Sequence, residues 1–160
     1  MIVHNIRSCH NVGSLLRTAE GLGVEAVWLT GYTPYPKCQN DPRLPHEALK
    51  LSKQINKTAL GAEDYVTWFH KPDIFDLITD LKKYGYDIAA LEQTRDSKPL
   101  HSFKPPKRTA LVVGREVDGL ETEVLEVCDL SLEIPMSGKK ESFNVSAAAA
   151  MALYHLKFAA

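Results

Sequence analysis

The sequence lacks the features that mark membrane-bound, secreted and metal-binding proteins. Its cysteines, Cys9, Cys38 and Cys128, are odd in number and form no C-x-x-C pair, which argues against a disulfide framework and a zinc site. No apolar run approaches the ~20 residues of a membrane helix, and the longest, residues 147–156, is too short. Residues 1–4 have neither the basic start nor the apolar stretch of a signal peptide. We therefore expect a cytoplasmic protein without a membrane anchor or a resident metal.

Neither sign of charge dominates the chain. The formal net charge is −1, with 24% charged and 44% hydrophobic residues, so the protein as a whole is not a basic module that coats RNA. Local patches can still bind phosphate. There is no internal repeat and no low-complexity tract. The 160 residues fit a single globular domain, residues 1–160, long enough to bury a core without disulfides.

Strand-like and helix-like patterns alternate along the chain. Strands are expected over residues 2–6, 24–30, 86–92, 109–114 and 130–134. Helices are expected over residues 11–21, 46–56, 120–127 and 143–158, with another opened by Pro72 and closed by Gly85. This alternation predicts an α/β fold with a mostly parallel sheet and helices on both faces. Three unusual segments lie at strand-to-helix transitions, where such folds commonly place their sites.

The first segment is a polar loop, with Arg7 and Asn11, that leads into a helix. Arg17 follows Asn11 by six positions, not quite two helical turns. Its side chain can therefore turn back toward the same polar loop at the start of the helix. A helix N-terminus beside arginines suits a phosphate. The alternative is that Asn11 only caps the helix and Arg17 is a solvated surface residue.

The second segment is a strand that ends at Gly114, followed by Glu116 and then Gly119 before a helix. Glycine lets the backbone approach a ligand closely, and the carboxylate can orient a donor or meet a cation. The segment lacks both G-K-[ST] and G-x-G-x-x-G, so it is neither a P-loop nor a dinucleotide fingerprint.

The third segment begins where a strand ends at Pro135 and continues through a loop with two lysines to the last helix. Ser142 and Asn144 stand at the entry to that helix. They are site candidates, or they only cap the helix while the lysines lie in solvent. Ser142 lacks a G-x-S-x-G context and is therefore not expected to be a nucleophile.

Together these segments resemble, in the right order, the three motifs of the SpoU/TrmH family within the SPOUT class of methyltransferases. The matching residues are Asn11 and Arg17 in N-V-G-S-L-L-R-T-A, Gly114 and Glu116 in V-V-G-R-E-V-D-G-L, and Ile134-Pro135-Met136 with Ser142-Phe143-Asn144-Val145-Ser146. The resemblance covers residues 2–156. Arg115 and Val117 differ from the small or amide residues common at their places in the second motif.

The resemblance implies an α/β domain whose C-terminal segment threads a loop to make a deep trefoil knot, an exception to the usual rules of chain connection. It also implies that the knot loops bind S-adenosylmethionine, largely through backbone groups. The residues then expected around the cofactor are Leu91, Gly114, Ile134, Met136 and Ser142.

The same resemblance implies transfer of a methyl group to the 2′-hydroxyl of an RNA ribose. Arg17 would contact or deprotonate that hydroxyl, and the residues ordering the site would be Asn11, Glu116, Ser142 and Asn144. A guanidinium keeps its proton well above neutral pH. We therefore expect Arg17 to position the hydroxyl and the adjacent phosphate and to stabilise the developing oxyanion.

The expected partners are RNA and a second copy of the chain. Lys50, Lys53 and Lys57 recur at helical spacing as a basic stripe, and with Arg7, Arg17 and Arg43 they are the candidate RNA-binding residues. Lys104, Lys107 and Arg108 form a second basic cluster. The last helix is apolar almost all round, so it must be buried on more than one side, within its own domain or, as in family members, in a homodimer.

A structured target such as tRNA or rRNA is expected. Two alternatives stay open: a SPOUT enzyme that methylates a base, and a non-catalytic RNA-binding protein that retains the fold. A nucleotide-binding regulatory module is disfavoured because the phosphate-loop patterns are absent.

Overall fold

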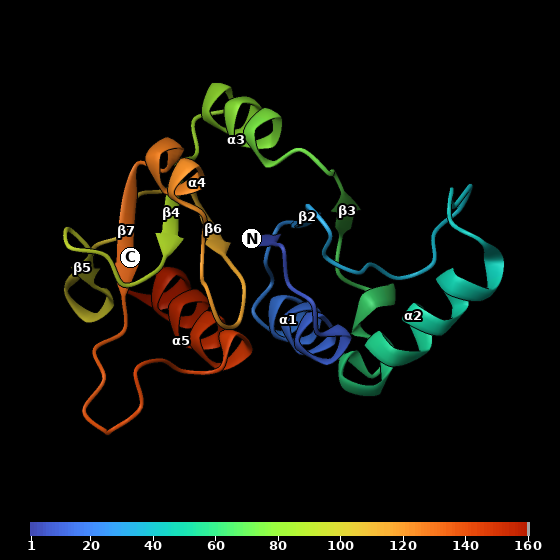
Figure 1. Ribbon diagram of the computed structural model, residues 1–160. Helices are drawn as coiled ribbons and strands as arrows, with labels where there is room; N and C mark the ends of the chain where they lie inside the picture. The colour runs from blue at the N-terminus through green and yellow to red at the C-terminus, as the bar shows by residue number, and fades with distance from the viewer. Residues whose placement is uncertain (160) are drawn as a thin grey trace.

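The computed structural model describes residues 1–159 as one parallel sheet packed between two groups of helices (Figure 1). The strands are β1 (Ile2–His4), β2 (Val27–Thr30), β3 (Trp68–His70), β4 (Asp87–Leu91), β5 (Lys98–Pro99), β6 (Thr109–Val113) and β7 (Leu130–Glu133). The α-helices are α1 (Cys9–Gly21), α2 (Pro45–Ala59), α3 (Ile74–Lys83), α4 (Thr122–Val127) and α5 (Val145–Phe158). Two 3-10 helices, η1 (Ala62–Asp64) and η2 (Leu100–Ser102), complete the elements. Ala160, the last residue of the predicted domain, lies outside the described residues.

The sheet order is β3-β2-β1-β6-β4-β7-β5, and every pairing of named strands is parallel. The carboxyl ends of the strands therefore meet at one edge. The chain runs outward from β1 through β2 to β3, at one side of the sheet. It then crosses β1 and forms the other half of the sheet from β4, β5, β6 and β7, so the direction of winding reverses between β1 and β6. Open α/β sheets bind ligands at such a point. The predicted α/β class with a mostly parallel sheet is confirmed.

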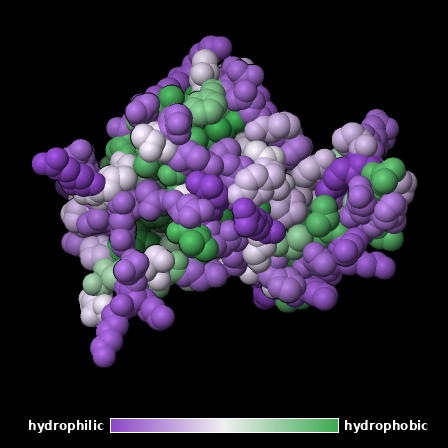
Figure 2. All heavy atoms as spheres, in the orientation of Figure 1, coloured by the Kyte–Doolittle hydropathy of each residue, from purple (hydrophilic) through white to green (hydrophobic). Residues whose placement is uncertain are grey.

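Alternate residues of the central strands face two separate cores, because side chains alternate between the faces of a sheet. Val3, Leu111 and Val113 pack with residues of α1, α2 and α5. Ile2 and Val112 pack with α3 and α4 on the opposite face. Figure 1 shows these two helix groups on opposite sides of the strands. In the same view the surface is largely hydrophilic, with apolar side chains in small groups (Figure 2).

Several predicted boundaries are wrong. The helix opened by Pro72 begins instead at Ile74, because the Asp73 carboxylate caps it by accepting from the backbone N–H groups of Phe75 and Asp76, at 2.8 and 3.1 Å. The strand predicted over residues 24–30 begins only at Val27. β3 and β5 were not predicted, since these edge strands of two or three residues contain no apolar run that marks them.

The start of α1 resolves one of the alternatives left open by the sequence. Ser8 caps the helix, and its hydroxyl accepts from the backbone N–H of Asn11 at 3.2 Å. The alternative that Asn11 is the cap is therefore wrong, and its side chain is free to bond elsewhere. None of the helices within residues 1–159 is long and apolar enough to cross a bilayer.

Gly13 sets the spacing between α1 and α2. A Cβ atom at this position would lie 2.2 Å from both the carbonyl oxygen of Ile55 and Oγ1 of Thr58. Such contacts are far below van der Waals distance, so any side chain forces the two helices apart. Residues of α1 and α2 share one core with residues of α5. The spacing between α1 and α2 therefore affects the packing of this whole helix group.

We predict that Gly13→Ala destabilises the protein by about 2 kcal/mol through overpacking, although alanine is the better helix former. For a chain of this size the melting temperature should fall by roughly 4–8 °C, measured by calorimetry. Gly21→Ala is the matched control, since a Cβ there meets nothing within 4 Å. Equal melting temperatures for the two variants would show that the α1–α2 contact does not require glycine.

Candidate active site

A chain of side-chain hydrogen bonds joins the three segments singled out in the sequence. The Asn11 side-chain amide donates to Oε1 of Glu116 at 3.0 Å. The Asn144 amide donates in turn to Oδ1 of Asn11 at 3.2 Å. The three residues come from the start of α1, the loop after β6 and the N-cap of α5. Positions more than 100 residues apart thus meet at the carboxyl edge of the sheet, beside the β1–β6 reversal.

Asn144 also caps α5, so the capping alternative is confirmed for it, while its role in a site stays a prediction. Its Oδ1 accepts from the backbone N–H of Ser146 at 2.9 Å and from the Ser146 hydroxyl at 2.6 Å. Its amide nitrogen still bonds Asn11. The cap therefore fixes the orientation of the Asn144 amide group, which is the last member of the series of hydrogen bonds.

Glu116 is held as a carboxylate. Burial raises its pKa, but the hydrogen bonds from the Asn11 side chain and from the backbone N–H groups of Glu116, Ser8 and Arg7 outweigh that effect. The net result is a pKa below the ordinary value. The site therefore contains a fixed negative charge at neutral pH.

Next to Glu116 the strand ends enclose a pocket. The loops after β4, β6 and β7 and the entry to α5 form its walls, with apolar side chains such as Val113, Leu132 and Phe143 beside exposed backbone. Of the five residues expected around a cofactor, Leu91, Gly114, Ile134 and Ser142 line this pocket. Met136 is not among the lining residues, because it lies two positions further along the loop that leaves the sheet.

The two glycines of the second motif are required by close packing. A Cβ on Gly114 would lie 2.7 Å from Cγ of Leu120. Gly119 has a φ of 68°, and a Cβ on it would lie 2.1 Å from a carboxylate oxygen of Glu92. The loop can therefore fold back over the pocket only with glycine at these positions.

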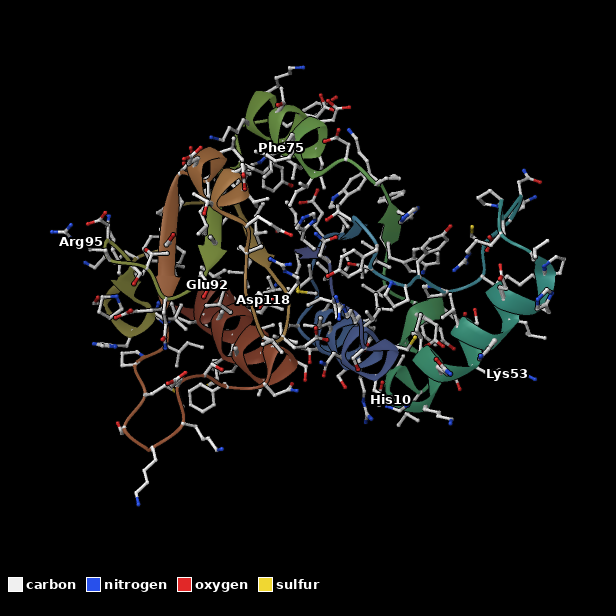
Figure 3. All side chains as sticks on the ribbon, in the orientation of Figure 1. His10, Lys53, Phe75, Glu92, Arg95 and Asp118 are labelled. Carbon is white, nitrogen blue, oxygen red and sulfur yellow. The ribbon has the colours of Figure 1, made fainter. Side chains whose placement is uncertain are left out.

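Glu92 is a site residue that the sequence analysis missed. Its Oε2 accepts from the backbone N–H of Leu120 at 3.0 Å and its Oε1 from that of Gln93 at 3.1 Å. In Figure 3, Glu92 and Asp118 both lie over α5 at the ends of β4 and β6. The sequence offered one signal for Glu92: it is a charged residue directly after the carboxyl end of a strand that was expected to be buried.

Arg115, which departs from the common pattern of the second motif, stabilises the loop after β6 through ion pairs. Its guanidinium lies 3.7 Å from the carboxylates of both Asp118 and Glu121. Glu121 also accepts from the Asn5 amide at 2.8 Å and lies 3.4 Å from the buried ring of His4. Burial raises the pKa of Glu121, but hydrogen bonds and the nearby charges outweigh it, so the pKa is lowered. The loop is thereby tied to the end of β1.

Arg17 is on the same helix as Asn11 but is not part of the hydrogen-bond chain. It is exposed on α1, and within residues 1–159 its side chain makes no hydrogen bond or ion pair. Among the same residues no cluster of three His, Cys, Asp or Glu side chains could hold a metal ion.

The predicted RNA-binding residues divide into two groups. Arg7 and the three lysines of α2, Lys50, Lys53 and Lys57, are exposed, and Lys53 points away from the helix in Figure 3. Arg43 differs, because its guanidinium donates to the Asp41 carboxylate and to the carbonyls of Tyr35 and Pro36. It also stacks 3.5 Å from the Tyr35 ring centroid. Arg43 is thus a clamp within the loop after β2.

The second basic cluster lies far from the site. Lys104, Lys107 and Arg108 precede β6, at the amino end of the strands. Arg108 bonds the Tyr84 carbonyl at 3.0 Å. The cluster is therefore at the opposite edge of the sheet from Glu116.

We predict that Glu116→Gln lowers the free energy of unfolding by about 1 kcal/mol at pH 7, since charge-assisted hydrogen bonds are lost from a half-buried group. A carboxylate with a lowered pKa stabilises the fold above its ordinary pKa of 4.5 and loses that effect as pH falls through the folded value. The gap between variant and wild type should therefore shrink toward pH 3 in denaturant titrations. Glu126→Gln, at an exposed glutamate of α4, is the control. A gap independent of pH would contradict the prediction.

Comparisons with known proteins show which family the chain belongs to and which fold it shares. Residues 1–154 match the model of the SpoU rRNA Methylase family. The chain is 33% identical over 153 residues to the 23S rRNA (guanosine-2′-O-)-methyltransferase RlmB of Neisseria meningitidis serogroup B, covering 96% of this chain and 55% of the relative. The chain thus spans about half the length of the curated relatives it matches.

Solved structures show the same fold. An AdoMet-bound rRNA methyltransferase from Sinorhizobium meliloti superposes with a TM-score of 0.80 at 21% identity, over 97% of this chain and 54% of the other. A protein studied for 2-OH methylation on tRNA superposes with a TM-score of 0.72 at 23% identity, over 97% and 93% of the two chains. Because the family model matches nearly the whole chain, residues 1–154, the chain belongs to the SpoU rRNA methylase family.

Proposed function

We propose that the chain is an RNA methyltransferase that transfers a methyl group from S-adenosylmethionine to a ribose 2′-hydroxyl. The observation that carries this proposal is the hydrogen-bonded set Glu116, Asn11 and Asn144, of which Glu116 lines the pocket and Asn11 lies on α1, the helix that also carries the exposed Arg17. Membership of the SpoU family supports it, as does the 2′-O activity in the name of the Neisseria relative.

The pocket fits S-adenosylmethionine by its chemistry. An adenine needs apolar walls for its faces and backbone polar groups for its edge, and Leu91, Leu132 and Ile134 stand beside glycine-containing backbone. When bound, this cofactor supplies an electrophilic methyl group on a sulfonium. We assign the holding of the cofactor to the loops that end β4, β6 and β7, with Ser142 at the mouth.

The residues beside the pocket act by positioning. Glu116 is a carboxylate whose hydrogen bonds are already satisfied from one side, so it orients rather than accepts a proton. The guanidinium of Arg17 makes no hydrogen bond or ion pair within residues 1–159 and is available to the hydroxyl and its phosphate. A positioned cation stabilises the alkoxide that forms as the hydroxyl attacks, and fixed alignment lowers the entropic part of the barrier.

We place the RNA across α1 and α2. Arg7, Arg17, Lys50, Lys53 and Lys57 are exposed, and phosphate binding needs such free cations. Arg43 is left out because its donors are used within its own loop. The substrate class we propose is tRNA or rRNA, acted on in the cytoplasm.

The trefoil knot implied by the sequence resemblance is part of the proposal. The loop after β7 reaches Gln93, whose side-chain amide donates to the carbonyl of Glu141 at 3.1 Å. Residues of this loop share the pocket with the loops after β4 and β6. Such mutual contact is what threading of the C-terminal segment requires.

We also propose a homodimer through α5. Only Ala149, Ala152 and Leu153 of this helix are buried in the chain, although the helix is apolar almost all round. Met151, Tyr154 and Phe158 are exposed, at 38%, 61% and 61%, and lie at helical spacing on one face. A second copy of the chain would cover this stripe.

The reaction is tested by incubating the protein with methyl-labelled S-adenosylmethionine and total bacterial RNA, followed by digestion and identification of the labelled nucleoside. A 2′-O-methylated nucleoside is expected. A nucleoside labelled on its base would assign the chain to base methylation. Binding of RNA and cofactor without transfer would favour the non-catalytic alternative.

We predict that Arg17→Ala and Arg17→Lys both lower turnover by about 100-fold or more, as loss of an oxyanion donor does, because a lysine lacks the planar fork. Since Arg17 is exposed and makes no hydrogen bond or ion pair within the part of the chain that the structure describes, melting temperatures should stay unchanged. Arg95→Ala, at another exposed arginine (Figure 3), should retain full turnover. Near-normal rates for Arg17→Lys would rule out a need for the guanidinium.

We predict that Tyr154→Glu converts a dimer to a monomer, because it places a charge in the apolar stripe of α5. Sedimentation equilibrium would report the mass. Tyr84→Glu, at an exposed tyrosine following α3, is the control and should leave the mass unchanged. If the wild-type chain sediments as a monomer at micromolar concentration, the α5 interface is wrong.

A further inference from the structure

A second hollow opens at the carboxyl edge of the sheet, over β1, β2 and β3. Its volume is about 370 Å³, and its walls come from the loop after β1, the loop after β2 and the end of β3. Arg7, Cys9, Tyr32, Tyr35 and His70 are among its lining residues. The cofactor pocket occupies the other half of the edge, over β4, β6 and β7.

Glu116 links the cofactor pocket to the loop that lines the second hollow. This carboxylate lines the cofactor pocket and accepts from the backbone N–H of Ser8 at 3.3 Å, and also from that of Arg7. The neighbours of Ser8, Arg7 and Cys9, line the second hollow. Residues 7–9 therefore connect Glu116 to the second hollow, and a group bound at Glu116 lies near this loop as well as in the cofactor pocket.

Among the lining residues within 1–159, Tyr32 offers the second hollow an exposed aromatic ring, and Arg7 offers a cation that makes no ion pair. Tyr32 is 50% exposed, and the Arg7 guanidinium lies 5.9 Å from its ring centroid. Tyr35 is not free, because Arg43 covers one ring face at 3.5 Å and the His70 ring stacks on it at 3.9 Å. A flat heterocycle entering the hollow therefore meets Tyr32, with a positive charge beside it.

The position of Tyr32 is fixed by hydrogen bonds. Its backbone N–H donates to Oδ1 of Asn5 at 3.1 Å. The next residue, Thr33, is buried; its hydroxyl donates to the Val3 carbonyl at 3.1 Å and accepts from the Ile6 N–H at 3.1 Å. The backbone that carries the ring is thus fixed next to β1, and only the side chain needs ordering when a ligand stacks on it.

We propose that this hollow receives the base of the nucleotide whose ribose is modified, stacked on Tyr32, with Arg7 at the adjoining phosphate. The inference rests on the proposed function. The base is attached to C1′, the carbon next to the C2′ that bears the reacting hydroxyl. A ribose at Glu116 that turns its hydroxyl toward the cofactor pocket directs its base away from that pocket, toward the hollow over β1–β3.

The chemistry of a nucleobase matches what the hollow offers. Single-stranded bases are commonly bound by stacking on aromatic side chains, and any base can stack. Arginine beside the ring supplies the charge that a phosphate needs. The target nucleotide is therefore unpaired when it binds, in a loop or flipped out of a helix.

Kinetics with Tyr32→Ala and Tyr32→Phe test the stacking. Loss of the ring should raise the KM for RNA by about 10-fold or more, while the dissociation constant for S-adenosylmethionine stays unchanged, and phenylalanine should restore the RNA KM. Tyr65→Ala, at a tyrosine 82% exposed outside both hollows, is the matched control. Tyr32→Ala with the same RNA KM as Tyr65→Ala would overturn the proposal.

Crosslinking tests the same contact without relying on methyl transfer. Bacterial tRNA and rRNA transcripts carrying 5-bromouridine are irradiated with the wild-type chain, and the crosslinked peptides are mapped by mass spectrometry. Attachment at Tyr32 supports the proposal, even if no methyl group is transferred, in which case only the proposed reaction fails. Methyl transfer with crosslinks confined to other residues overturns the base pocket and leaves the proposed reaction intact.

Discussion

The site depends on one side chain, that of Asn11, which both donates and accepts a hydrogen bond. The amide of Asn11 donates to Glu116 and accepts from Asn144, which a carboxylate or a hydrocarbon of similar size cannot do together. The bond to Glu116 is strengthened by the charge of the carboxylate. Through this amide, the first helix fixes the loop after β6 and the start of the last helix at the same point.

The sheet explains why these three segments can meet. All pairings are parallel and β1 lies beside β6, so every loop that follows a strand emerges at one edge. α1 begins a few residues after β1, so its first turn brings backbone N–H groups to that edge. The pocket beside Glu116 and the hollow over β1–β3 lie at two halves of this edge, on either side of the point where the winding reverses.

Much of this arrangement could be predicted from the sequence. The alternation of apolar runs and helical patterns gave the α/β class, because burial on both sides of a parallel sheet leaves a strong pattern. The polar segments after three strands gave Asn11, Glu116 and Asn144. Leu91, Gly114, Ile134 and Ser142 line the pocket as expected, but their roles, like those of Arg17 and the lysines, stay predictions.

The remainder depends on contacts that no local pattern encodes. Glu92 acts by reaching the backbone of Leu120, and Arg115 by reaching Glu121; neither partner is marked in the sequence. Arg43 looks like any surface cation until Asp41 and Tyr35 are seen around it. The short strands β3 and β5 form because neighbouring strands offer them hydrogen bonds, so tertiary pairing rather than propensity decides them.

The hydrogen bond between Asn11 and Asn144 spans 133 positions of the chain, and this separation bears on how the protein is made. Long-range contacts carry a large loop-closure entropy and form slowly. The three segments of the site cannot assemble until the final helix has been synthesised and has docked against α1. A ribosome-bound chain that still lacks α5 therefore lacks the bond from Asn144 and the part of the pocket wall that α5 supplies, so the site is completed only when this helix docks.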